Sequence, residues 1–232
     1  MRIMRGWRIA TAAVVFSLGG VASATGISYT GSFSTDDQLQ YFQFTASNSS
    51  VIINSLGYGG GTNVAGSKIP AGGFAPFLSL FDETGGSEFA ASNGLIASTT
   101  SGSVPGGGCS GNPDPSVGGA CLDVSITEGA GQLIAGQMYL VVLSEVDNSP
   151  NGNTFGAGFS EVGNGDFTGP NFGCTNNSFC DPFGNNRTAN YAVDITVNSA
   201  ATVPEPGTEF LLLAGIAAAL VLRKQLAGAA KH

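Results

Sequence analysis

The stretch ANYAVDITVN, residues 189–198, alternates apolar and polar side chains over most of its length. Tyr191, Val193, Ile195 and Val197 stand at every second position. Successive side chains of a β-strand point to opposite faces, so a period of two predicts a strand with one apolar face. No stretch ahead of the C-terminal tail shows a convincing apolar stripe of helical period, so strands are expected elsewhere too.

Seven further short stretches have strand character. They are ISYTGSFS (27–34), LQYFQFTAS (39–47), SVIINSLGY (50–58), FLSLFDE (77–83), GLIASTT (94–100), CLDVSITE (121–128) and MYLVVLSEV (138–146). In the second of these, Leu39, Tyr41 and Gln43 share one face. Phe42 and Phe44 share the other, so we expect both faces to be partly covered. About eight short strands with glycine-rich connections predict an all-β fold, an antiparallel β-sandwich or jelly roll.

The N-terminus has the three parts of a secretory signal peptide. Three arginines lie within the first eight residues, and the apolar run IATAAVVFSL follows at residues 9–18. Ala22 and Ala24 then fit the small-residue rule for signal cleavage. The apolar run is short for a membrane span, so we predict a signal peptide over residues 1–24 and a mature protein that starts near Thr25.

Three long, turn-rich connections lie between the predicted strands, at residues 57–73, 101–120 and 148–182. The cysteines form two close pairs, Cys109 with Cys121 and Cys174 with Cys180. They lack a Cys-x-x-Cys spacing and a nearby histidine, which argues against zinc. Export makes disulfides the expected state, and of the three possible connectivities we favour the local one. Such bridges would staple the long loops.

The region that remains, residues 25–202, is predicted to form one domain, the β-sandwich, and is strongly acidic. It holds two basic side chains, Lys68 and Arg187, against fourteen acidic ones, a formal charge of −12. Such a surface repels phosphate backbones, which excludes nucleic acid, and it suits solubility or divalent cations. The sole histidine, His232, lies outside this region, so Ser-His-Asp, Cys-His and histidine–zinc sites are not available to it.

Calcium is the cofactor that the acidic loops suggest, because it binds about six to eight oxygen atoms on bending loops. The segment DNSPNG, residues 147–152, begins like an EF-hand loop, but Pro150 interrupts it and Gly158 stands where a bidentate glutamate belongs. An irregular calcium site is therefore the hypothesis. Its candidate ligands are Asp147, Asn148, Asn151 and Asp166, and Asp36 and Asp37 form a second candidate site. The alternative in both places is a turn in which these side chains bond their own backbone.

Carbohydrate binding is a further hypothesis. Phe155, Phe159, Phe167 and Phe172 lie in an asparagine-rich loop, and exposed aromatic rings beside amides and acids are typical of sugar sites. Burial of these rings within the loop is the alternative. The sole tryptophan, Trp7, lies in the predicted signal peptide, so the mature domain has no tryptophan platform.

The tail, residues 203–232, has three parts of a different kind. They are the rigid start Val203, Pro204, Glu205 and Pro206, an apolar run at residues 210–222, and the basic pair Arg223 and Lys224. The apolar run is predicted to be a hydrophobic helix of about 20 Å, against a hydrocarbon core of about 30 Å. It would insert into the membrane only transiently, with the basic pair on the cytoplasmic side.

This three-part tail resembles the PEP-CTERM sorting signal of Gram-negative bacteria. The resemblance implies passage through the inner membrane, recognition and cleavage by an exosortase-type membrane protease, and association with exopolysaccharide. It implies a secreted or cell-surface protein. Eight residues, QLAGAAKH, follow the basic pair, so a retained anchor is the alternative.

The sandwich region has a resemblance of its own. YTGSFSTDDQLQYFQFT (29–45) is similar to the opening of bacterial pre-peptidase C-terminal-like β-sandwich domains. GYGGGTNVAGSKIPAGGFAPFLSLFDETG (57–85), VDNSPNGNTFGAGF (146–159) and NRTANYAVDITV (186–197) are similar to domains found on PEP-CTERM proteins. This resemblance implies the sandwich fold and no particular activity.

Together these patterns predict an exported, non-enzymatic protein of the cell surface or extracellular matrix, associated with exopolysaccharide and biofilm. The first alternative is a calcium-dependent carbohydrate-binding module. The second is a glycan-active hydrolase that uses two carboxylates, although no motif selects a pair. Assembly into fibres through an edge strand is a third.

Overall fold

The computed structural model describes residues 24–47, 50–83, 89–99, 122–176 and 178–198. The described residues all belong to one compact unit, Ser23–Ala200. Three predicted features lie outside the described residues. They are the signal peptide up to residue 23, the pair Cys109 and Cys121, and the sorting tail with its apolar run at 210–222.

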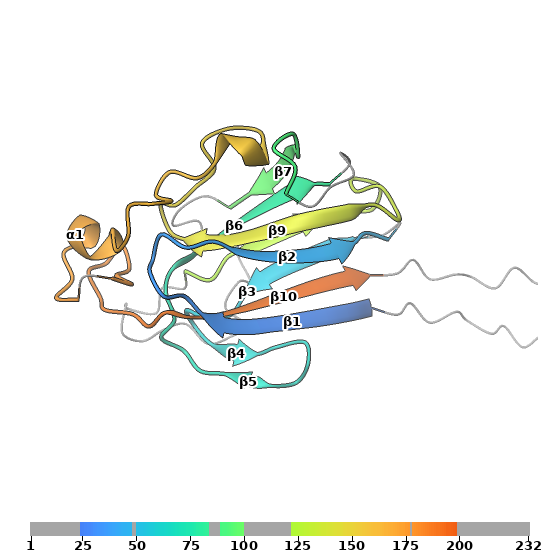
Figure 1. Cartoon of the computed structure of the whole chain (residues 1–232). Coiled ribbons are helices and arrows are strands. Elements are labelled where there is room, and N and C mark those ends of the chain that lie inside the picture. Colours follow the sequence, from blue (N-terminus) through green and yellow to red (C-terminus); the bar gives the residue numbers. More distant parts are fainter. Residues whose placement is uncertain (1–23, 48–49, 84–88, 100–121, 177, 199–232) are drawn as a thin grey trace, which may run out of the picture. The chain divides into compact units, whose positions relative to one another are not determined.

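Two four-stranded antiparallel sheets make up the domain (Figure 1). Sheet A has the order β1 (Ala24–Ser32), β10 (Asn190–Asn198), β3 (Val51–Ser55) and β8 (Ser125–Glu128). Sheet B has the order β2 (Gln40–Thr45), β9 (Met138–Glu145), β6 (Pro76–Asp82) and β7 (Leu95–Ser98). A separate hairpin pairs β4 (Gly61–Thr62) with β5 (Lys68–Ile69). The predicted antiparallel all-β fold is confirmed.

Nine residues of the stretch at 189–198, Asn190–Asn198, form β10, which lies between β1 and β3. Val193 and Ile195 are fully buried in the core, as the period of two predicts. The opposite face is covered as well, because Asp194 accepts the N–H of Val64 at 2.9 Å and the hydroxyl proton of Ser28. Val64 belongs to the turn between β4 and β5, so this hairpin covers part of sheet A.

Side chains from both sheets form the main apolar core. Sheet A contributes Val51, Ile53, Ile126, Val193 and Ile195, and sheet B contributes Phe42, Phe44, Leu78, Leu80, Val141 and Leu143. Full burial of one side chain of this size contributes about 1.5–3 kcal/mol to the free energy of folding. The layer between the sheets is therefore the main source of stability.

Sheet B is covered on its outer face too. Phe81, Leu140, Val142 and Phe159 form a second apolar cluster there, with Leu39, Leu95 and Phe155 packed against it. Phe155 and Phe159 lie in the segment that follows β9 and folds back over the sheet. The two inner strands of sheet B, β6 and β9, are therefore buried on both sides, which explains the continuous apolar run in β9. The expectation that both faces of the 39–47 stretch are partly covered is confirmed.

Two one-turn helices lie in the connection at residues 148–182, where the sequence predicts none. They are a 3₁₀ helix, Phe155–Ala157, and α1, Thr168–Phe172. Each is too short to repeat an apolar position, so a helical period could not reveal it. Among the described residues, no helix has the length and apolar character needed to cross a membrane.

The difference in burial between two isoleucines predicts unequal effects on stability. Ile195→Ala should lower the free energy of unfolding by about 2–5 kcal/mol, because it leaves a cavity between the sheets. Ile134→Ala, at a side chain that is 65% exposed, should change it by less than about 0.5 kcal/mol. Urea unfolding of both variants measures the difference, and equal losses would contradict this assignment of the core.

Candidate functional site

Connections from both sheets meet at one end of the sandwich, where β1 and β9 finish and β10 begins (Figure 1). We call this end, which includes α1, the loop end. Asp36 lies there, fully buried, just after β1. Its carboxylate accepts the N–H of Phe167 at 2.8 Å and the N–H of Thr168 at 2.9 Å, and also the Thr168 hydroxyl proton. Asp36 therefore fixes the start of α1 against β1.

Asp37 and Asn148 hold a second segment of the same connection. The carboxylate of Asp37 accepts the N–H groups of Gly163 and Gly165, each at 3.0 Å. Asn148 donates its amide to the Asp37 carbonyl oxygen at 3.0 Å. Burial raises the pKa of Asp37, but hydrogen bonds from the Thr35 side chain and from the two glycines outweigh it and lower the pKa. These contacts favour an ionised, structural carboxylate.

The predicted calcium ligands thus separate into two groups. Asp36, Asp37 and Asn148 come together at the loop end and bind protein N–H groups, whereas Asp147, Asn151 and Asp166 are exposed. Backbone donors already occupy lone pairs that a cation would use. In the described part of the chain, no three side chains of His, Cys, Asp or Glu are grouped so that they could hold a metal ion. Calcium at these residues stays a prediction.

Asp181 and Arg187 form a buried ion pair at the loop end. The guanidinium lies 2.7 Å from the Asp181 carboxylate and 3.9 Å above the centre of the Tyr58 ring. The Tyr58 hydroxyl also donates to Asp181, at 2.9 Å. Burial raises the pKa of Asp181, but hydrogen bonds from the Asn185 N–H, Arg187 and Tyr58 outweigh it and lower the pKa. The pair therefore stabilises the ionised carboxylate.

Asp123 lies at the loop end on the side of sheet A, just before β8. It is fully buried and accepts the N–H groups of Tyr58 and Gly59 at 3.1 and 2.7 Å, and the Ser55 hydroxyl at 3.0 Å. Burial raises its pKa, and these hydrogen bonds offset only part of that effect. The predicted local disulfide, Cys174 with Cys180, is present and tightens the connection after α1.

The predicted sugar-binding phenylalanines are mostly packed inside. Phe159 and Phe167 are 5% and 6% exposed, and Phe172 packs against the small cluster of Tyr58, Ala75, Leu122 and Val146. The alternative of buried loop packing is therefore correct for these three. Phe155 is only half-buried and reaches the surface of sheet B.

Phe155 forms an exposed aromatic patch with Tyr41 and Phe89. The ring centres lie 5.0 Å apart for Tyr41 and Phe89, and 6.0 Å from each of these to Phe155. Tyr41 is 36% exposed and Phe89 is 43% exposed, and the Phe89 backbone has a left-handed φ of 59°. The sequence pattern places Tyr41 on one face of its strand, but it gives no sign of Phe89, which has no periodic neighbours. Tyr41 and Phe89 therefore leave part of their side chains exposed to solvent beside the half-buried Phe155.

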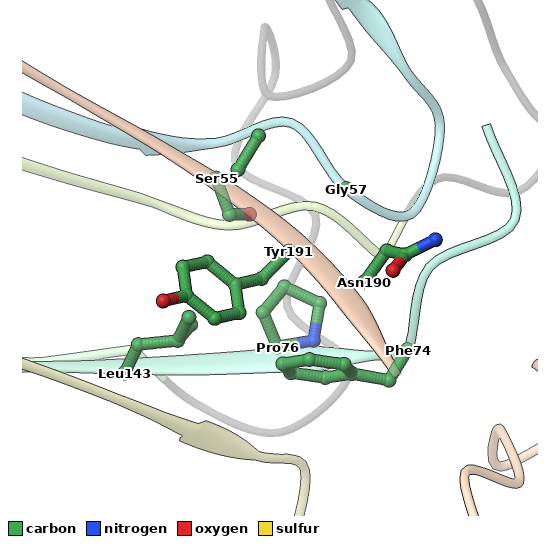
Figure 2. Close-up of a pocket in the computed structure, with 8 residues that line it drawn as sticks. Ser55, Gly57, Phe74, Pro76, Leu143, Asn190 and Tyr191 are labelled. Carbon is green, nitrogen blue, oxygen red and sulfur yellow. The ribbon is translucent and has the colours of Figure 1, made fainter. Parts of the chain in front are cut away.

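A small hollow also lies at the loop end, between the two sheets. Figure 2 shows the rings of Phe74, Pro76 and Tyr191 around it, with Ser55 and Leu143 beside them. It has no space for a water molecule, so it is a gap in the packing.

The C-terminal tail matches a known family of protein-sorting motifs. A family model described as the PEP-CTERM protein-sorting motif matches residues 202–225. The chain carries a PEP-CTERM motif. The match contains the predicted Pro-Glu-Pro start, the apolar run and the basic pair. No curated protein and no solved structure matches the chain, so the resemblance of the sandwich to pre-peptidase domains stays a prediction.

The PEP-CTERM motif implies export, sorting to the bacterial cell surface and processing by an exosortase membrane protein. The motif lies outside the described residues. What the structure describes is thus the domain that this signal delivers.

The buried ion pair predicts a pH-dependent stability. Asp181→Asn should lower the free energy of unfolding at pH 7 by about 3–5 kcal/mol, because the buried charge of Arg187 loses the carboxylate that it faces. The pKa of Asp181 is lowered by folding, so its stabilisation is present above the unfolded pKa of about 3.9 and is lost as the pH falls through the folded pKa. Urea unfolding along an acid series measures both effects. Asp166→Asn, at an exposed carboxyl, is the control, and a loss of stability equal to that of Asp181→Asn would contradict the assignment.

Proposed function

We propose that this protein is a non-enzymatic component of the cell surface or extracellular matrix of a Gram-negative bacterium. The observation that carries the proposal is the PEP-CTERM motif at residues 202–225, together with the predicted signal peptide at residues 1–24. An exosortase releases the β-sandwich, which then binds or builds the exopolysaccharide layer of a biofilm.

The use of the acidic side chains supports a binding or structural role. Asp36, Asp123 and Asp181 are fully buried, and each accepts hydrogen bonds from backbone N–H groups. A glycan hydrolase needs one protonated and one ionised carboxyl that face each other across a substrate. The three buried carboxyls hold loops together, which favours the non-enzymatic proposal.

The aromatic patch of Tyr41, Phe89 and Phe155 favours a glycan as ligand. Aromatic rings offer large apolar faces at little cost in conformational entropy, and the apolar face of a sugar ring can stack on them. Gln43 lies two residues from Tyr41 on the same face of β2, where its amide bonds the Glu83 carboxylate at 3.0 and 3.1 Å. The formal charge of −12 over residues 25–202 disfavours anionic chains, so we propose a neutral polysaccharide.

Processing at the motif predicts a shortened protein. Intact mass and terminal peptides from the matrix fraction of the native host should show a start near Thr25 and an end within residues 203–206. A variant with Pro204→Ala, Glu205→Ala and Pro206→Ala should keep its tail, because the extended segment that the protease reads is lost. A wild-type protein that ends at His232 and occurs only in membranes would contradict processing and indicate a retained anchor.

Glycan binding predicts loss of retention when the patch is removed. The double variant Tyr41→Ala and Phe89→Ala should bind an insoluble neutral glucan about fivefold to tenfold more weakly than wild type in a pull-down titration. Phe183→Ala is the matched control, because Phe183 is 58% exposed and is not part of the patch. Equal retention of all three proteins, or retention by the anionic polysaccharide alginate alone, would overturn the glycan proposal.

A further inference from the structure

Strand β1 is an edge of sheet A, and it is the longest edge strand among the described residues. It has nine residues, Ala24–Ser32, against six in β2 and four each in β7 and β8. It contains no charged residue and no proline, and its ladder with β10 has no bulge. Proteins usually protect a sheet edge with short strands, charges, prolines or bulges. The edge of β1 has none of these protections.

The backbone of β1 bonds to β10 through every second residue. The N–H of Phe33 donates to the carbonyl oxygen of Ala189 at 3.0 Å, and the register of the two strands continues from this pair without a shift. Hydrogen-bonded pairs alternate with non-bonded pairs along an antiparallel ladder. The residues of β1 that bond to β10 are therefore Thr25, Ile27, Tyr29 and Gly31.

The intervening residues turn their N–H and carbonyl groups away from β10. They include Gly26, Ser28, Thr30 and Ser32, and none of the described residues bonds to these backbone groups. The β4–β5 hairpin rests on the face of β1, where a Cβ atom at Gly26 would lie 2.8 Å from the Val64 side chain. Its two strands pair only with each other. Gly26, Thr30 and Ser32 are exposed, so the edge can accept a further strand.

We propose that the β1 edge pairs with the β1 edge of a second copy of this chain. Two identical strands can pair antiparallel about a two-fold axis, because each then offers the other the same groups. The outward groups match when Ser28 lies on that axis, since Gly26 is then opposite Thr30 of the second copy. Sheet A of one copy continues into sheet A of the other.

The side chains beside the edge support a second copy as the partner. Ile27 is 40% exposed and lies on the same inner face as Tyr29, which packs against the main core. In the proposed register, Ile27 lies opposite Tyr29 of the second copy. An aromatic ring beside a β-branched side chain is a favourable cross-strand pair. Pairing thus covers an apolar side chain that the single domain leaves exposed.

The other edges fit β1 less well. β8 has four residues and ends in Glu128, and β7 has four residues and a register shift in its ladder with β6. β2 has six residues. Each would leave part of the nine-residue β1 unpaired. A β1–β1 pair matches the two strands over their whole length and closes as a dimer, whereas β1 on a different edge of the next copy would continue into a fibre.

Charge limits the strength of this dimer. Each copy has a formal charge of −12 over residues 25–202, so two copies repel each other at low ionic strength. Strand β1 itself is uncharged, and the contact along one edge is small. We expect a weak dimer with a Kd of about 10–100 μM, which becomes tighter as added salt screens the repulsion.

Analytical ultracentrifugation of the protein purified from its native host, with the termini that processing leaves, tests the proposal. Wild type should sediment as a monomer and dimer in equilibrium. Thr30→Pro should raise the Kd about tenfold or more, because the two-fold axis removes a hydrogen bond at Thr30 in both copies. Its Tm should stay near that of wild type, since proline is tolerated on the open side of an edge strand. Thr30→Val keeps the N–H and is the matched control, so it should dimerise as wild type does.

Four results would overturn the proposal. They are a wild-type protein that stays monomeric up to about 1 mM, a folded Thr30→Pro variant that dimerises as wild type does, an equal loss in Thr30→Val, and species larger than a dimer. Association that weakens with added salt would also contradict it, because attraction between charges would then hold the copies together.

If Thr30→Pro fails to fold, amide hydrogen exchange of the wild-type protein, followed by NMR, decides. Exchange at Ser28 and Thr30 should slow as the protein concentration rises, whereas exchange at Tyr29 should be slow throughout because its N–H bonds to β10. Exchange at Ser28 and Thr30 that does not depend on concentration would contradict the dimer. If it is slow even in dilute protein, another segment of the same chain covers the edge. None of these readouts depends on glycan binding.

Discussion

The hydrogen bonds of Asp36 hold the loop end of this protein together. The carboxylate follows β1 directly and accepts the N–H groups of Phe167 and Thr168, which lie more than 130 positions later in the chain. Those N–H groups lie at the start of the one-turn helix α1, so they do not take part in a β-sheet. Buried backbone donors need partners, and here a side chain supplies them in place of a sheet. The connection at residues 148–182 keeps a defined path as a result.

The same use of carboxylates recurs around the loop end. Asp123 binds the backbone at Tyr58 and Gly59, and Asp181 binds that at Phe183 and Asn185. An acidic composition is usually explained by solubility or by cationic partners. In this domain, several acidic side chains instead accept backbone N–H groups and so hold in place long connections that contain little regular secondary structure.

Local patterns made much of the fold predictable. The period of two in β10 depends on neighbouring residues only, and so does the disulfide between Cys174 and Cys180, six positions apart. The aromatic patch was not predictable, because Phe89 meets Tyr41 through tertiary packing. Glu145 was missed for a similar reason. In the sequence it is an ordinary polar end to an apolar strand, and only its complete burial without a hydrogen-bond partner among the described residues makes it unusual.

The pairing of the first and last strands determines how the domain is displayed. Ala24 lies opposite Asn198 in the register of β1 and β10, so the chain enters and leaves the sandwich at neighbouring points. The nine residues of β10 separate this exit from the loop end, a distance of about 30 Å for an extended strand. A link to any surface through the segment after Asn198 would therefore act at the far end.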